Sequence, residues 1–217
     1  MRILGVADIH GAHRRIADMM KREGDIDILL LAGDLTTNGT ARDARAVLDA
    51  AGPSGPRVFA VAGNMDPQPV EVLLAVEGQS LHGRGIILGD VGFCGLSGAP
   101  LSPLHTPNEL PEAELASHLA AAWEGVRAAR WKVLVSHAPP AGTRVDMLTN
   151  GLHVGSSAVR TFCDEQQPDL VLCGHIHEAR GVDRIGRTIV VNPGPARTGA
   201  YCIITIDGAI RVVPGQL

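Results

Sequence analysis

The sequence predicts an α/β fold in which two β-sheets pack together with helices outside, and three observations support this prediction. Aliphatic strand candidates alternate with helical segments in the first half of the chain, which is typical of parallel strands joined by right-handed crossovers. The second half is rich in hairpin signals such as Asp207-Gly208. Aromatic residues make up only 3% of the 217 residues, so Val, Ile, Leu and Ala must build the core. No repeat or linker interrupts the chain, and we expect a single domain over residues 1–217.

Three buried strands are expected in the first part of the chain, and each runs into a polar turn. The strands are residues 3–7, 28–32 and 58–62, and the turns after them are Asp8-Ile9-His10, Gly33-Asp34 and Gly63-Asn64. Helices are expected over residues 14–22 and through residue 50, the second with Thr40 as its N-cap. Sites in open α/β sheets form at the carboxyl ends of strands, so the polar turns are candidate site residues.

The second part of the chain combines further strands with two long loops. The expected strands are residues 85–88, 91–96, 131–136, 170–173, 188–191, 201–206 and 209–213. Helices are expected over residues 112–130 and from residue 156 or 157 to residue 166. The loops cover residues 97–111 and 141–155, and loops of this length are usually functional.

Composition and charge argue against several classes of protein. A net charge of −4 argues against an extended nucleic-acid surface, which needs clustered Lys and Arg. No apolar run approaches the roughly 20 residues of a membrane span, and the apolar start reaches Asp8 too soon for a signal peptide. The four cysteines form no C-x-x-C pair, so we expect them to be reduced in a cytoplasmic protein.

The main site signal is Gly174-His175-Ile176-His177, which follows the strand candidate over residues 170–173. Two histidines one residue apart on an extended chain point to the same side, about 6.6 Å apart. The two ions of a hydrolytic metal pair lie about 3.5–4 Å apart, so these imidazoles could hold one ion each or share one ion. Asp8 and His10 have the same spacing.

Together, the strand-end side chains form a set of carboxylates, imidazoles and one amide. The set is Asp8, His10, Asp34, Asn64, His137, His175 and His177. With no thiolate, these donors suit Mn, Fe, Ni or Zn rather than a cysteine-rich structural zinc site. Seven side chains are too many for one ion and suit two, if one carboxylate bridges. The alternative is that each residue is a separate polar cap at a strand end.

The order of these motifs resembles that of the calcineurin-like metallophosphoesterases, and in particular their small bacterial and archaeal Icc-related members. The motifs are Asp8-x-His10, Gly33-Asp34, Gly63-Asn64-x-Asp66, Ser136-His137-Ala138-Pro139-Pro140, Gly174-His175-x-His177 and Asn192-Pro193-Gly194-Pro195. The resemblance implies a four-layer α-β-β-α sandwich, with two mixed β-sheets flanked by helices, and hydrolysis of a phosphate ester at a dinuclear metal site. It assigns Asp8, His10 and His177 to one ion. It assigns Asn64, His137 and His175 to the other, with Asp34 as the bridge.

The chemistry of an ion pair agrees with this reaction, because two cations can clamp phosphate oxygens and turn a bridging water into a hydroxide nucleophile near neutral pH. Asn64 can ligate through its oxygen and also donate from its nitrogen to steady the phosphate. Asp66 is expected either to orient a ligand histidine or to cap a helix before Pro67.

One position departs from the family. Many members carry a histidine after the asparagine of the Gly-Asn motif, as the acid for the leaving group. Here the residue is Met65, whose thioether has no proton to give. His105 and His153 in the two long loops are candidates to enter the site, and Arg144 is a candidate phosphate contact. For each, the alternative is a solvated loop side chain.

We therefore expect a metal-dependent phosphoesterase, with diesters favoured because a diester with a good leaving group depends less on an acid. The expected cofactor is a pair of divalent ions, manganese first, with iron, nickel or zinc as alternatives. The expected partner is a small phosphate ester, with a nucleotide as one candidate, and a homodimer is a candidate assembly. The alternatives are a metal-binding scaffold that has lost catalysis, which Met65 favours, and a nuclease, which the missing basic cluster disfavours.

Overall fold

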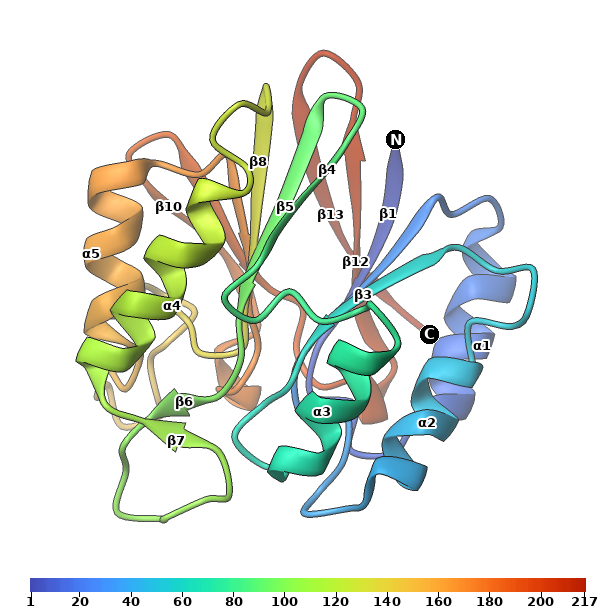
Figure 1. Cartoon of the computed structure of the whole chain (residues 1–217), viewed down its shortest axis with the longest axis horizontal. Helices are drawn as coiled ribbons and strands as arrows, with labels where there is room; N and C mark the ends of the chain where they lie inside the picture. The colour runs from blue at the N-terminus through green and yellow to red at the C-terminus, as the bar shows by residue number, and fades with distance from the viewer.

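Two mixed β-sheets pack face to face in the middle of the molecule, and helices cover the outer face of each (Figure 1). The computed structural model describes residues 1–217. The five-stranded sheet contains β1 (Arg2–Val6), β2 (Ile28–Ala32), β3 (Arg57–Val61), β12 (Ala200–Ile206) and β13 (Ile210–Gln216), in the order β13-β12-β1-β2-β3. The strands β1, β2 and β3 are parallel, whereas β12 and β13 form an antiparallel hairpin beside β1.

The six-stranded sheet comes mainly from the second half of the chain. It contains β4 (Gly85–Leu88), β5 (Val91–Leu96), β8 (Trp131–Ser136), β9 (Leu170–Leu172), β10 (Gly181–Ile185) and β11 (Thr188–Asn192), in the order β10-β11-β9-β8-β5-β4. Its central strands are parallel, and both edge strands are antiparallel to their neighbours.

Helices complete the outer layers (Figure 1). The helices α1 (His13–Glu23), α2 (Ala41–Asp49) and α3 (Gln68–Val76) cover the five-stranded sheet, and α4 (Glu112–Glu124) and α5 (Ser157–Gln166) cover the other sheet. The result is a four-layer α-β-β-α sandwich, which confirms the expected fold class. None of these helices has the length and apolar character that crossing a bilayer requires.

Apolar clusters fill the three spaces between the four layers. The side chains of β1 divide between two of them with the period of a strand: Leu4 and Val6 face the helices, whereas Ile3 faces the other sheet. Between the sheets, the rings of Phe59 and Phe93 lie 5.5 Å apart. The central strands are buried on both faces, which explains why they read as continuous aliphatic runs.

Three details differ from the sequence expectations. The helix α3 was given no range and entered only as the helix that Asp66 could cap; it begins after Pro67 and carries Pro69 in its first turn, where a missing amide costs no hydrogen bond. The helix α4 ends at Glu124 rather than at residue 130, and a Cβ atom on Gly85 would lie 2.8 Å from the Cα atom of Gly125 just beyond it. The long loop over residues 97–111 contains the short pair β6 (Ala99–Pro100) and β7 (Glu109–Leu110).

Candidate metal centre

The carboxyl ends of parallel strands from both sheets meet at one edge of the sandwich, and they bring the predicted ligands together. Asp8 and His10 follow β1, Asp34 follows β2, Asn64 follows β3, His137 follows β8, and His175 and His177 follow β9. His10 and His177, which are 167 residues apart in the chain, are brought into contact in this way. The topology therefore produces the convergence that the order of motifs predicts.

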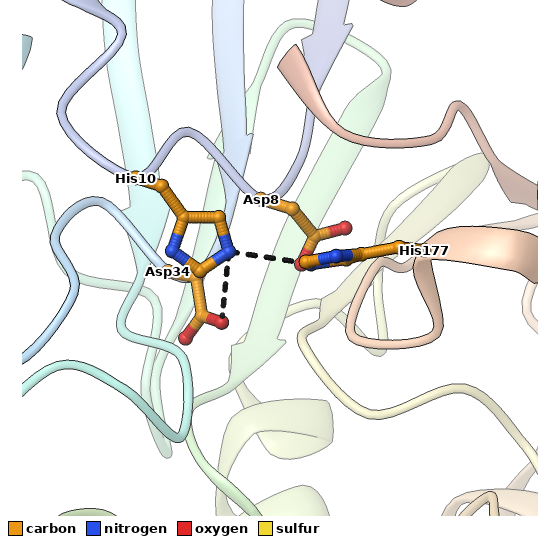
Figure 2. Close-up of side chains that lie close together, drawn as sticks. All are labelled: Asp8, His10, Asp34 and His177. Carbon is orange, nitrogen blue, oxygen red and sulfur yellow. Dashed lines mark hydrogen bonds and ion pairs between the residues drawn. The ribbon is translucent and has the colours of Figure 1, made fainter. Parts of the chain in front are cut away.

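Four of these side chains form one tight cluster (Figure 2). Asp8, His10, Asp34 and His177 each offer one ligand atom, and these atoms all lie within 4.8 Å of one another. The Nε2 atoms of His10 and His177 are 3.2 Å apart. The Nε2 atom of His10 lies 3.6 Å from Oδ2 of Asp34, and that of His177 lies 3.7 Å from Oδ1 of Asp8. Two imidazoles and two carboxylates that face one point form a candidate site for a divalent ion.

A second group lies on the other side of Asp34. Its Oδ1 atom is 3.5 Å from Nε2 of His137, whereas its Oδ2 atom belongs to the first cluster. The Oδ1 atom of Asn64 lies 2.9 Å from Nε2 of His137 and 2.9 Å from Nδ1 of His175. The two oxygens of Asp34 therefore face two different groups of donor atoms.

The ring of His137 shows that a cation fits this second group. Its Nδ1 atom lies 2.9 Å from the carbonyl oxygen of Ala32, which can only accept, so Nδ1 carries the ring hydrogen. In the neutral ring, Nε2 then presents a lone pair to the oxygens of Asn64 and Asp34. Acceptor atoms that face one another are unfavourable unless the ring takes up a second proton or a cation lies among them.

The surroundings of Asp8 also favour a bound cation, in this case in the first cluster. It is fully buried, and its Oδ1 atom accepts a hydrogen bond of 2.9 Å from the amide of His175. Its Oδ2 atom is also buried but has no hydrogen-bond partner. A buried carboxylate oxygen without a partner is costly, and a bound cation would remove that cost.

The electrostatics of the cluster leave it with a mixture of charged and neutral donors. Burial raises the pKa of Asp34 to about 6, although the positive charge that His137 carries when protonated opposes the rise. Burial and the same charge lower the pKa of His175 to about 3, so its ring is neutral at pH 7. For Asp8, burial acts to raise the pKa, but its pairing with His177 and the charge of His137 lower it overall. Metal binding requires deprotonated ligands, and a cation stabilises the charged form of a carboxylate such as Asp34.

The backbone around the cluster is held in uncommon conformations. Asp8, His10, Asp34 and His175 all have positive φ angles, between 48° and 70°. Non-glycine residues adopt this region at a cost of about 1–3 kcal/mol each, and such residues concentrate at functional sites. Gly63 is needed for a different reason, because a Cβ atom there would lie 2.0 Å from Oδ1 of Asp34.

Asp66 ties two of the strand-end loops together. Its buried carboxylate accepts hydrogen bonds from the amides of Leu35, Thr36 and Gly63 and from the hydroxyl of Thr36, at 2.7–2.9 Å. Both sequence interpretations of Asp66 were wrong, because the carboxylate contacts no ligand histidine and the N-cap of α3 is Pro67. Its role is instead to hold the loop that carries Asp34 against the loop of Gly63.

Two threonines that the sequence analysis missed orient site residues. The Oγ1 atom of Thr37 lies 2.7 Å from Nδ1 of His10, and the Oγ1 atom of Thr106 accepts a 3.0 Å hydrogen bond from Nδ2 of Asn64. These partners are 27 and 42 residues from the side chains that they contact, and no local pattern marks them.

The three loop candidates do not have a hydrogen bond or ion pair with the seven side chains. His105 is exposed on its loop. The Nδ1 atom of His153 pairs with Oδ1 of Asp146 at 2.7 Å. Arg144 lines a separate cavity of about 320 Å³ beside Glu178, the residue after His177. Substrate contacts by His105, Arg144 and His153 stay predictions.

Comparison with known proteins places the fold and the motifs in a known family. The family model described as calcineurin-like phosphoesterase matches residues 1–179. An uncharacterized protein of Methanocaldococcus jannaschii is 32% identical over 206 residues, which cover 93% of this chain and 91% of that protein.

Solved structures agree in fold at low identity. The protein TT1561 of Thermus thermophilus has a TM-score of 0.69 at 19% identity, covering 99% of this chain and 98% of that one. A dimetal phosphatase from Danio rerio has a TM-score of 0.70 at 13% identity, covering 100% and 95%. Because the family model covers most of the sequence and its motifs converge in the fold, this chain belongs to the calcineurin-like phosphoesterase family.

Proposed function

We propose that the protein is a metal-dependent phosphoric ester hydrolase with a dinuclear centre, and that it prefers small phosphodiesters. Family membership supports phosphoesterase activity and implies divalent metal ions. The observation that carries the dinuclear proposal is the position of Asp34, with Oδ2 at 3.6 Å from Nε2 of His10 and Oδ1 at 3.5 Å from Nε2 of His137. A carboxylate between two groups of donor atoms suits two ions better than one.

In this proposal the seven side chains divide between two divalent ions. Asp8, His10 and His177 would hold the first, Asn64, His137 and His175 would hold the second, and Asp34 would bridge them. Manganese is the first candidate, with iron, nickel or zinc as alternatives, because these metals accept mixed imidazole and oxygen ligands. Such ions, when bound, would clamp phosphate oxygens and make hydroxide available as a nucleophile near neutral pH.

Neighbouring groups of the chain hold three of the proposed ligands in the orientation that metal binding requires. His10 and His137 are each held at Nδ1, by Thr37 and by the carbonyl of Ala32, so their Nε2 atoms stay directed at the centre. Asn64 uses one amide hydrogen in its bond to Thr106, which keeps Oδ1 turned toward His137. Its second amide hydrogen is available to donate to a phosphate oxygen.

The preference for diesters rests on Met65. Its amide donates a 2.8 Å hydrogen bond to Oδ1 of Asp34, so this residue adjoins the centre. Its side chain cannot protonate a leaving group. A diester with an activated leaving group loses least from the missing acid. We place the protein in the cytoplasm, in keeping with four cysteines that are all free and buried.

The proposal is tested by metal content and turnover. Protein purified without chelator should contain about two ions per chain, and with added Mn²⁺ it should hydrolyse bis-p-nitrophenyl phosphate faster than p-nitrophenyl phosphate. Asp34→Asn should lose most of both metal and activity, whereas Asp49→Asn, the same change at an exposed site on α2, should keep both. Full activity in Asp34→Asn would contradict the bridging role, and turnover of monoesters alone would contradict the diester preference.

The alternative is a metal-binding scaffold of the same fold with little catalysis, and the missing acid at Met65 is the observation that favours it. A full set of hydrolytic ligands argues against it, because a scaffold has no need of them. Bound metal without turnover of any monoester, diester or nucleotide ester would favour the scaffold.

A further inference from the structure

Arg197 lies beside the candidate metal centre and has no assigned role. It belongs to the short 3-10 helix η2 (Ala196–Thr198), which follows the Asn192-Pro193-Gly194-Pro195 loop. Its side chain is exposed and has no hydrogen bond or ion pair with the rest of the chain. By contrast, Arg211 on β13, at the end of the five-stranded sheet opposite the candidate metal centre, is paired with Asp207 at 2.6 Å.

The backbone of η2 is fixed directly against the strand end that carries Asp8. The amide of Ala196 donates a 3.0 Å hydrogen bond to the carbonyl of Ala7, and Pro195 forms a parallel bridge with the same residue. Ala196 is fully buried in the apolar cluster beneath α1–α3. Asp8 follows Ala7 in the chain, so the attachment point of Arg197 is held close to the first cluster of ligands.

A permanent cation attached at this point, beside the strand end that carries Asp8, would supplement the field of any bound ions.

We propose that Arg197 binds a non-bridging oxygen of the phosphoryl group that is hydrolysed, an inference that rests on the proposed function. A guanidinium presents donors in a fixed planar fork that matches phosphate geometry. Its side chain is free to turn toward an anion because no residue of the chain engages it. Arg197 is then a substrate-binding residue that selects for the charged phosphoryl group rather than for the alcohol part of the ester.

The test uses the full chain loaded with Mn²⁺ and inorganic phosphate as the probe. In calorimetric titrations, Arg197→Ala should weaken phosphate binding about ten- to hundredfold, the effect of losing hydrogen bonds between charged partners. Arg197→Lys should fall in between, because it keeps the charge but not the fork. Arg211→Ala, which removes the same charge at the far end of the sheet, should bind phosphate as the unchanged protein does. Manganese content should be equal in all variants, and the KM for the ester should rise in Arg197→Ala with little change in kcat.

Two results would overturn the inference while leaving the proposed function in place. One is phosphate binding in Arg197→Ala equal to that of the unchanged protein, when the unchanged protein holds two ions and turns over esters. The other is loss of manganese in Arg197→Ala and Arg197→Lys alike, which would make Arg197 a support of the metal site. Failure of the proposed function is distinct, because the unchanged protein would then hold no ion pair and hydrolyse no ester.

Discussion

The Nε2 atom of His137 lies 2.9 Å from the Oδ1 atom of Asn64, and each atom presents a lone pair to the other in the neutral pair. The unpartnered Oδ2 atom of Asp8 adds a similar cost in the first cluster. These contacts are tolerable in the folded protein if cations occupy the centre. Their consequences for stability and metal binding are open to direct measurement.

Manganese should stabilise the folded protein against heat and denaturant. Ions that bind only the folded chain add about 2.7 kcal/mol per site when present at a hundredfold excess over Kd. We expect Tm to rise as Mn²⁺ is added to chelator-treated protein and to fall again with chelator. Asp34→Asn is the matched comparison, because it removes the carboxylate shared by both groups of donor atoms. Its Tm should rise much less when Mn²⁺ is added. A Tm that is independent of Mn²⁺ in the unchanged protein would contradict the metal centre.

Asp66 should be essential for stability without touching the substrate. Asp66→Asn keeps the shape of the side chain but turns one accepting oxygen into a donor that faces backbone amides, and we expect a loss of about 2–4 kcal/mol in the free energy of unfolding. Thr36→Val removes the hydroxyl bond to Asp66 and the bond that this hydroxyl accepts from the amide of Gly39, and it should cost about 1–2 kcal/mol, less than Asp66→Asn. Urea unfolding measures the loss of stability in both variants. Equal losses would contradict the proposal that the carboxylate of Asp66 holds the two loops together.

Much of this site could be predicted from the sequence because its ligands follow a topological rule. Asp8, Asp34 and His175 each lie within three residues of the end of an aliphatic strand, and parallel strands bring their carboxyl ends to one edge. The supporting residues follow no such rule. Thr37 and Thr106 reach His10 and Asn64 only through the final packing of distant loops.

Asp66 shows most clearly which contacts cannot be predicted from the sequence alone. Its position before Pro67 is typical of a helix cap, yet its carboxylate turns inward to the amides of Leu35 and Thr36. The two loops lie side by side because β2 and β3 are neighbours, and that pairing cannot be derived from residues 64–67 alone. The sequence suggested the helix α3 only as the element that Asp66 could cap, whereas its N-cap is Pro67.

Acid should loosen the loop that supports Asn64. Burial acts to raise the pKa of Glu109, but hydrogen bonds from Ser102 and Thr106 lower it to about 2. A folded-state pKa below the usual 4.5 means that these bonds stabilise the loop fully above about pH 4.5 and lose that effect as the pH falls toward 2. The NMR shifts of the Ser102 and Thr106 amides should therefore titrate with a midpoint near 2. Glu109→Gln should abolish this titration, and a midpoint near the usual value would contradict the network.

Met65→His should restore an acid next to the centre and change which esters are hydrolysed best. Positioned general acids contribute about 10²–10⁴-fold, and they matter only when the leaving group needs a proton. We expect turnover of phenyl phosphate to rise at least tenfold, while turnover of p-nitrophenyl phosphate, with its better leaving group, changes little. Met65→Leu is the control, because it alters the side chain without adding a proton donor, and it should leave the ratio of the two rates unchanged. The backbone bond from residue 65 to Asp34 is kept in both variants, so metal content should be equal. An equal rise for both esters would show that the new imidazole acts on metal binding and not as an acid.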